Sequence, residues 1–251
     1  MFTEGERYMS QLHQYKDYIS TLQDKQLTKE LLLVPELLLA VDHKLSVYYI
    51  PFEYVNESAK VMIIGITPGF TQMKLAYEQA IIGLGKGNPY PDIDKRAKGV
   101  ASFAGSMRKN LYSMLDAIGL PEAIGIESSE ALFEKDRHLL HTTSAVRYPV
   151  FRKGNNYTGH QPELVKSDFL MSYARSILLE ELRAVKEALI VPLGKSTADV
   201  LEKFIDEGEL DPVRCLLQMP HPSGANGHRF RQFAERKDEM ERRVKQWFLN
   251  R

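Results

Sequence analysis

The stretch VMIIGITPG, residues 61–69, decides the fold. It begins with four apolar residues, and such a short, continuous apolar run is typical of a strand buried on both faces of a parallel sheet. The Thr-Pro-Gly turn at 67–69 ends this strand abruptly, and residues 73–83 follow with apolar residues at helical spacing. A buried strand, a sharp turn and a helix form half of a strand–helix–strand unit, so the stretch predicts an α/β protein.

The same alternation of apolar runs and amphipathic segments continues along the chain. Further apolar strands are predicted at residues 139–146 and 188–193 and within 213–224, a stretch that also contains the loop after the strand. Residues 46–55 are also predicted as a strand. Helices are predicted at residues 106–120, 164–186, 195–204 and 229–249. Four apolar strands separated by helices predict a three-layer α/β/α fold around a central four-stranded, mainly parallel sheet.

The remaining segments are predicted to surround this core. The first 45 residues carry apolar residues at helical spacing, so a helical N-terminal extension is expected over 1–45 of a single domain spanning 1–251. The stretches at 83–96 and 147–163 are rich in glycine, proline and polar residues, and both are predicted as loops.

Composition excludes several classes of protein. No apolar stretch approaches the roughly 20 residues that span a bilayer, and the polar N-terminus lacks the pattern of a secretory signal, so a cytoplasmic protein is expected. Cys215 is the only cysteine, which excludes an internal disulfide and any cysteine-only metal or iron–sulfur site. Lysine plus arginine and aspartate plus glutamate each number 33, so DNA binding would have to come from local clustering of charge.

Three turns fall at the carboxyl ends of predicted strands, where open α/β sheets bind their ligands. They are ITPGFTQ at 66–72, TTSAVRYP at 142–149 and MPHPSGANGHR at 219–229. Parallel strands bring their carboxyl ends to the same edge of a sheet, so these distant turns are expected to form one cleft.

Five segments resemble, in the same order, motifs of the uracil-DNA glycosylase superfamily. They are IGITPG at 64–69, SFAG at 102–105, HTTSAVR at 141–147, IVPLGK at 190–195 and MPHPS at 219–223. The resemblance implies a monofunctional enzyme that flips a base out of DNA and hydrolyses its N-glycosidic bond with water, leaving an abasic site. It also implies DNA as the partner, no cofactor and no metal.

The resemblance assigns roles to individual residues. His221 would donate a hydrogen bond to O2 of the leaving base, and Pro222 would restrict the backbone that aims it. Phe103 would stack on the flipped base. Further base contacts are expected from Ser144, Gly65, Ile66 and Gln72. Contacts to the DNA backbone are expected from Pro68, Gly69, Ser223, Gly224, Asn226 and Arg229.

Two positions depart from the pattern of the superfamily. Thr67 stands where many members have an aspartate or asparagine that orients the attacking water, and a threonine hydroxyl is a poor general base. Ser144 stands where relatives commonly have an asparagine that reads uracil, which predicts a roomier and less selective pocket. The middle segments most resemble the iron–sulfur branch, but its cysteines are absent.

Several alternatives stay open. The chain could be a catalytically weak or inactive DNA-binding module that senses a base, or an unrelated α/β enzyme that acts on nucleotides. The base could be uracil, a deaminated purine or a modified pyrimidine, in repair or against modified phage DNA. Phe103 could be an ordinary core residue, His221 a loop cap, and Gln72 and Arg229 surface residues. The oligomeric state is undetermined.

Overall fold

The structure is a computed structural model that describes residues 10–249. The chain forms two compact units that interleave along the sequence. Unit 1 comprises the chain up to Val55 together with Thr67–Ser102 and Val146–Thr158. Unit 2 comprises Asn56–Ile66, Phe103–Ala145 and the chain from Gly159 onward. Each unit is therefore described by itself, and the expectation of a single domain stays a prediction.

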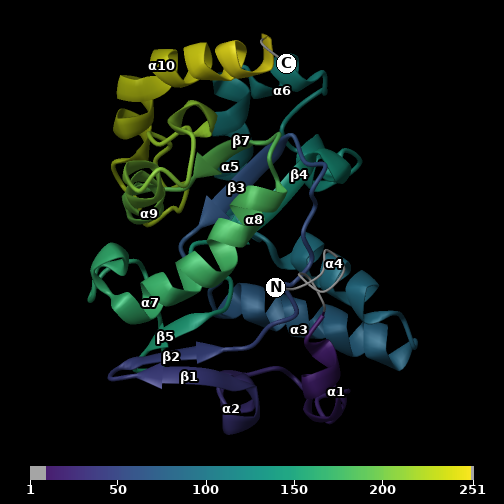
Figure 1. Cartoon of the computed structure of the whole chain (residues 1–251). Coiled ribbons are helices and arrows are strands. Elements are labelled where there is room, and N and C mark those ends of the chain that lie inside the picture. Colours follow the sequence, from purple (N-terminus) through teal and green to yellow (C-terminus); the bar gives the residue numbers. More distant parts are fainter. Residues whose placement is uncertain (1–9, 250–251) are drawn as a thin grey trace. The chain divides into compact units, whose positions relative to one another are not determined.

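Unit 2 is built on a parallel sheet in the strand order β4-β3-β7 (Figure 1). The strands are β3 (Val61–Gly65), β4 (Leu140–Ser144) and β7 (Leu189–Pro192), and every residue in them is buried. Strand β3 lies in the centre, with Val61 opposite Leu140 on one side and Leu189 on the other. Burial on both faces explains why these strands are continuous apolar runs, and the predicted α/β fold with a parallel sheet is confirmed.

The predicted fourth strand is wrong. Cys215 forms only an isolated parallel bridge with Ile190, to whose carbonyl oxygen the Leu216 N–H donates at 2.8 Å. The chain next reaches Pro220 and Pro222, and neither residue has the N–H that a growing ladder needs. An apolar run that looks like a strand in the sequence therefore supplies one bridge and then turns away.

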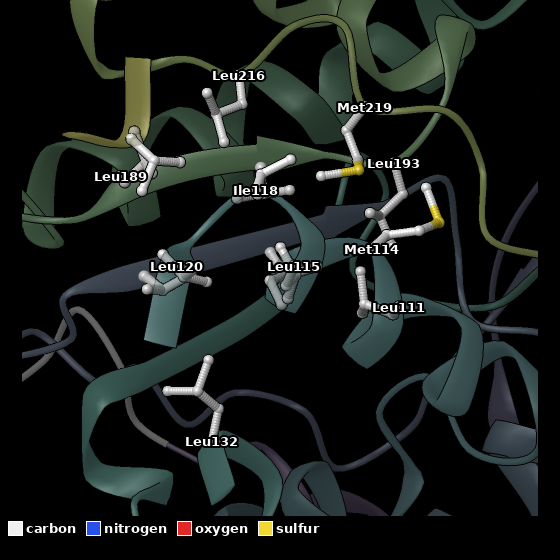
Figure 2. Close-up of a cluster of buried hydrophobic side chains, with 14 of the residues drawn as sticks. Leu111, Met114, Leu115, Ile118, Leu120, Leu132, Leu189, Leu193, Leu216 and Met219 are labelled. Atoms are coloured by element: carbon white, nitrogen blue, oxygen red, sulfur yellow. The ribbon is translucent and has the colours of Figure 1, made fainter. Parts of the chain in front are cut away.

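Helices cover both faces of the sheet in unit 2. On one face, α5 (Ser106–Ala117) and α10 (Arg229–Leu249) join the core formed by Val61 and Ile63 of β3. Figure 2 shows this core, in which the side chains of Leu111, Met114, Leu115 and Ile118 gather with Leu189, Leu193, Leu216 and Met219. On the other face, α8 (Leu179–Ala184) contacts the sheet through the buried pair His141 Nε2–Glu181 Oε2, at 3.0 Å.

The other elements of unit 2 are helical. They are α6 (Leu120–Ile124), η2 (Ala131–Phe133), η3 (Arg137–Leu139), η4 (Leu164–Lys166), α7 (Asp168–Tyr173), the π-helix η5 (Ala174–Leu178), α9 (Lys195–Asp206) and η6 (Pro212–Arg214). The helix predicted over 164–186 is thus confirmed as a series of helical turns. Those predicted over 106–120, 195–204 and 229–249 are confirmed as α5, α9 and α10.

Unit 1 combines helices with an antiparallel sheet in the order β1-β2-β5-β6. The strands are β1 (Leu38–Asp42), β2 (Leu45–Tyr48), β5 (Val150–Arg152) and β6 (Asn155–Asn156). The helices are α1 (Leu12–Ser20), α2 (Lys29–Leu32), η1 (Pro35–Leu37), α3 (Phe70–Gly85) and α4 (Tyr90–Ala101). Within residues 10–249, no helix combines the length and apolarity needed to cross a bilayer.

Three predictions for unit 1 are wrong in part. The helical extension predicted over 1–45 holds only for α1 and α2, and residues 1–9 lie outside the described residues. Residues 38–48 form a hairpin, and its second strand alternates buried and half-buried side chains. The predicted loop at 83–96 contains the start of α4, where Pro91 fits the first helical turn. The predicted loop at 147–163 contains the hairpin of β5 and β6, turned by two residues with positive φ, Lys153 and Gly154.

A buried carboxylate lies inside unit 1. Glu53 is 2% exposed, and its Oε1 accepts a hydrogen bond from the hydroxyl of Tyr148 at 2.9 Å. Asp94, Lys98 and Arg147 are also buried charged residues. Burial, reinforced by the negative charge of Asp94, raises the pKa of Glu53 from 4.5 to about 8, although Arg147 opposes this shift. The folded unit therefore holds a proton that an exposed glutamate would release.

Candidate active site

Three of the predicted base-binding residues meet at the carboxyl end of the unit 2 sheet. Gly65 ends β3 and lies opposite Ser144, which ends β4. A Cβ atom at Gly65 would lie 3.0 Å from Cε1 of Phe103 and 3.5 Å from Oγ of Ser144. A side chain at this position would require the aromatic ring to shift slightly, so glycine allows the closest approach of the ring to the strand.

Phe103 is held in an unusual backbone conformation. Its φ is +52°, in the left-handed region that a bulky residue rarely adopts, and Gly105 follows with φ +89°. Its side chain is 5% exposed and belongs to the buried core of unit 2. Phe103 is thus a core residue, and it is also the aromatic surface adjoining Gly65 and Ser144. Strained residues held by their surroundings cluster at functional sites.

His221 lies against the turn that follows β7. A Cβ atom at Gly194 would come within 2.9 Å of Cβ of His221, and Gly194 has a φ of +84° that disfavours any other residue. The N–H of Gly194 donates to the carbonyl oxygen of Met219 at 3.0 Å, which ties the turn to the chain just before His221.

The hydrogen bonding of His221 defines its tautomer. The backbone N–H of Ser223 donates to Nδ1 of His221 at 3.2 Å, so Nδ1 acts as an acceptor and the proton of a neutral ring belongs on Nε2. Desolvation by burial lowers the pKa of His221 below 6.5. The imidazole is therefore neutral at physiological pH, with an Nε2–H that can donate to a ligand.

These residues share one edge of the sheet. The Ala145 N–H donates to the Gly65 carbonyl oxygen and the Leu193 N–H to that of Ile64, each at 2.8 Å. These bonds hold the turns after β4 and β7 beside the end of β3. Gly65, Phe103 and Ser144 lie at the carboxyl ends of β3 and β4, and His221 lies against the turn that follows β7, at the edge where such sheets bind ligands.

Thr67 belongs to unit 1, immediately after Ile66 of unit 2. Its hydroxyl donates to the carbonyl oxygen of Tyr148 at 2.7 Å and accepts from the N–H of Val150 at 3.0 Å. The single hydroxyl proton is already used, so toward a water molecule this oxygen can act only as an acceptor. The hydroxyl also fixes the chain after Arg147 to the first motif, a structural role that the sequence does not reveal.

The other first-motif residues, also in unit 1, hold the start of α3. The N–H of Gly69 donates to Oε1 of Gln72 at 2.9 Å, so Gln72 caps the helix. The N–H of Phe70 donates to Oδ1 of Asn156 at 3.0 Å, and a Cβ atom at Gly69 would lie 3.1 Å from Nδ2 of Asn156. Pro68 is buried. The oxygen of Gln72, predicted to contact the base, thus has a structural partner.

The predicted DNA-contacting residues after His221 form a partly exposed loop in unit 2. Gly224 is exposed, and Ser223 and Arg229 are half-buried. Asn226 uses its side chain internally: Nδ2 donates to the carbonyl oxygen of His221 at 3.2 Å and to Oε1 of Gln232 at 3.0 Å. Its Oδ1 accepts from the N–H of His228 at 3.2 Å. The amide of Asn226 therefore braces the loop, whereas the sequence suggested a phosphate contact.

Comparison with known proteins identifies the family. A family model described as the Uracil DNA glycosylase superfamily matches residues 52–247. The chain belongs to this superfamily. It is also 45% identical over 221 residues, 87% of this chain and 86% of the relative, to a Bacillus subtilis (strain 168) protein named Uncharacterized protein YoxB. Membership of the superfamily suggests DNA glycosylase activity, with DNA as the partner.

The hydrogen-bond partners of two asparagines, one in each unit, could not be predicted from the sequence. Asn110 of α5 donates from Nδ2 to the carbonyl oxygen of Pro222 at 2.7 Å, and Asn156 holds the start of α3. Asn110 begins the segment that follows SFAG and shares its resemblance to the superfamily, and Asn156 lies in the loop predicted at 147–163, but no local pattern reveals the distant partner of either side chain. Among residues 10–249, no group of three His, Cys, Asp or Glu side chains is arranged to hold a metal ion.

The hydroxyl of Thr67 should contribute measurably to stability. In Thr67→Val the shape is kept but the Tyr148 carbonyl and the Val150 N–H lose their partner, so we expect the free energy of unfolding to fall by about 1–3 kcal/mol. Urea denaturation measures this change. Thr67→Ser retains the hydroxyl and should recover most of the loss, whereas equal midpoints for the Val and Ser variants would contradict the assigned role.

Proposed function

We propose that the protein is a monofunctional DNA base glycosylase that hydrolyses the N-glycosidic bond of a flipped uracil, deaminated or modified base. The observation that carries this proposal is the half-buried imidazole of His221, which lies against the turn after β7 and whose Nδ1 accepts a hydrogen bond from Ser223, so that a neutral ring carries its proton on Nε2. The superfamily fold together with the His221 donor supports base excision more strongly than the alternative of an unrelated α/β enzyme that acts on nucleotides.

In the proposed reaction the bond between the sugar C1′ and the base nitrogen breaks, and its electron pair leaves with the base. Negative charge then gathers on O2 of a pyrimidine, where the Nε2–H of His221 donates a hydrogen bond. Water adds to C1′ and gives its proton to the released base. The products are a free base and an abasic site.

Thr67 suits a reaction in which bond breaking precedes attack by water. Its hydroxyl donates to Tyr148, so it can accept a hydrogen bond from water and thereby orient it, but it cannot act as a general base. A dissociative path needs an oriented water more than a deprotonated one. The departure from aspartate or asparagine is therefore compatible with catalysis.

The first turn of α10 offers a surface suited to DNA. Phe230 is 73% exposed, and the guanidinium of Arg229 lies 4.2 Å from the centre of its ring. Arg231 is also exposed, and the first turn contains no acidic residue. Since the chain as a whole has no net charge, this local cluster supports binding of a polyanion with stackable bases.

Abasic-site formation on a panel of oligonucleotides tests the proposed function. Each carries one uracil, hypoxanthine, xanthine or modified pyrimidine in single- or double-stranded DNA, and alkali cleaves wherever a base has been removed. Cleavage that depends on the protein supports the glycosylase. Tight binding without cleavage would support the alternative of a base-sensing module, and neither binding nor cleavage would leave a different α/β enzyme as the explanation.

The side chain at Ser144 should control base selectivity. Ser144 is 9% exposed and lies beside Gly65 and Phe103, so an asparagine there would bring an amide that pairs with N3–H and O4 of uracil. We expect Ser144→Asn to raise the rate for uracil relative to the other bases by about tenfold. Ser172→Asn on the exposed face of α7 is the control. An unchanged ratio would remove Ser144 from base recognition.

A further inference from the structure

Side-chain amides hold the backbone around His221. Pro222 has no N–H, so this residue cannot donate a backbone hydrogen bond of its own. Gly224 and Gly227 follow, both exposed, and a Cβ atom at either would meet no other atom within 4 Å. A hydrogen-bond donor to a reacting base must be held to within about 0.5 Å, so the hydrogen bonds that hold this segment decide how precisely the imidazole is aimed.

Two asparagine side chains hold the two consecutive carbonyl groups of this segment. Nδ2 of Asn226 donates to the carbonyl oxygen of His221 at 3.2 Å, and Nδ2 of Asn110 donates to that of Pro222 at 2.7 Å. These carbonyls belong to the peptide planes on either side of Pro222. Fixing both planes fixes the backbone from which the imidazole projects.

We propose that Asn110 and Asn226 are positioning residues that act through His221, a clamp of two amides that aims its Nε2–H at the leaving base. The inference rests on the proposed function, because that function gives the direction of the imidazole its importance. The backbone N–H of Ser223, which donates to Nδ1 of His221, completes the arrangement from the following peptide.

Asn110 connects the loop to the packed core through α5. It lies on α5 next to Leu111, and Leu111 and Leu115 are fully buried in the cluster of Figure 2. The same helix begins three residues after Phe103. One packed helix therefore fixes both the aromatic ring beside Gly65 and the peptide that follows His221, so the two groups keep a constant relation to each other.

Asn226 connects the loop to the start of α10. Its amide also donates to Gln232 Oε1 at 3.0 Å and accepts from the N–H of His228, so it is tied to the first turn of the helix. Both members of the clamp are uncharged. An aspartate in either place would put a carboxylate next to the loop and favour a protonated imidazole.

The test compares Asn110→Leu, which keeps the approximate size and removes the donor, with Asn110→Gln, which keeps an amide. We expect Asn110→Leu to lower kcat about tenfold with little change in KM, because the group acts on the transition state through His221 and does not bind substrate. Asn110→Gln should recover part of the rate. Asn88→Leu, a half-buried asparagine in the turn between α3 and α4, is the matched control.

Nitrogen-15 NMR of the imidazole measures its tautomer, a property that would not change if Asn110 only stabilised the fold. Wild-type His221 should show the single Nε2–H tautomer that the Ser223 contact defines, and Asn110→Leu should show a mixture of tautomers. In a His221→Ala background, Asn110→Leu should cause no further loss of rate, since two residues acting as a unit are not additive.

Three outcomes overturn the clamp: an unchanged kcat and tautomer, a loss confined to KM, or a full additional loss in the His221→Ala background. If Asn110→Leu fails to fold, Asn226→Ala in the exposed loop carries the same expectations. If the wild type excises no base from any oligonucleotide, the proposed function fails, but the tautomer measurement still decides whether the amides position His221.

Discussion

His221→Ala is expected to lower base excision by about 100-fold or more, the usual effect of removing one donor that stabilises developing negative charge. The pKa of the side chain is lowered by burial and its Nδ1 accepts a hydrogen bond, so a neutral ring carries the donor on Nε2; in the proposed reaction, its loss removes an interaction that forms mainly in the transition state. Single-turnover cleavage of a substrate oligonucleotide measures the rate, and binding of the uncleaved oligonucleotide should weaken far less.

The pH profile gives an independent check on this role. Because burial lowers the pKa of His221 below 6.5, the neutral donor persists as the pH falls through 6.5, and the wild-type rate should stay level there. His43→Ala, which removes a histidine whose side chain is 92% exposed in the turn between β1 and β2, is the control and should keep the wild-type rate. An undiminished rate in His221→Ala would exclude His221 from the mechanism.

Glu53→Gln is expected to stabilise the protein at alkaline pH. Folding raises the pKa of Glu53 from 4.5 to about 8, so in this interval the folded state binds a proton that the unfolded state has released. The free energy of unfolding therefore falls as the pH rises through this window, and the loss is complete above the folded pKa. One pKa unit corresponds to about 1.4 kcal/mol, so the change is on the order of 5 kcal/mol.

Asp94 adds to the same trend, because burial also raises its pKa, from 3.8 to about 6. Glutamine imitates the protonated glutamate and cannot ionise, so Glu53→Gln should match the wild type near pH 5 and exceed it by several kcal/mol near pH 9. Urea denaturation across this range measures the difference. Glu57→Gln, at an exposed position nearby in the sequence, is the control. Parallel pH curves for Glu53→Gln and the wild type would show that Glu53 ionises normally.

The order of motifs and the parallel sheet could be predicted because they are encoded locally. An apolar run such as residues 61–65 is buried on both faces wherever it sits in a sheet, and its length and its glycine–proline boundary mark it as a strand. The same reasoning failed at Cys215, which forms only a single bridge to the sheet. The length over which an apolar run pairs with a sheet depends on the path of the chain before and after the run.

The antiparallel sheet of unit 1 shows a second limit. Residues 38–48 have apolar residues that fit helical spacing as well as strand alternation, and pairing of β2 with β5, about 100 residues later in the chain, selects the strand. The turn of the β5–β6 hairpin is Lys153-Gly154. Because the surrounding residues are rich in glycine, proline and polar side chains, the sequence predicted a loop there. Tertiary pairing decided both cases.

The α/β class, the resemblance to the superfamily and the candidate residues Gly65, Phe103, Ser144 and His221 could all be read from local patterns in the chain. The hydrogen-bond partners of the polar atoms at these motifs could not, because they depend on the folded structure. The hydroxyl of Thr67 forms hydrogen bonds with the backbone after Arg147, Nδ1 of His221 accepts a hydrogen bond, and Asn110 holds a carbonyl 112 residues away in the chain. The physical reason is that burial periodicity is a local property of a chain, whereas a hydrogen bond between distant residues depends on the packing that brings its two ends together.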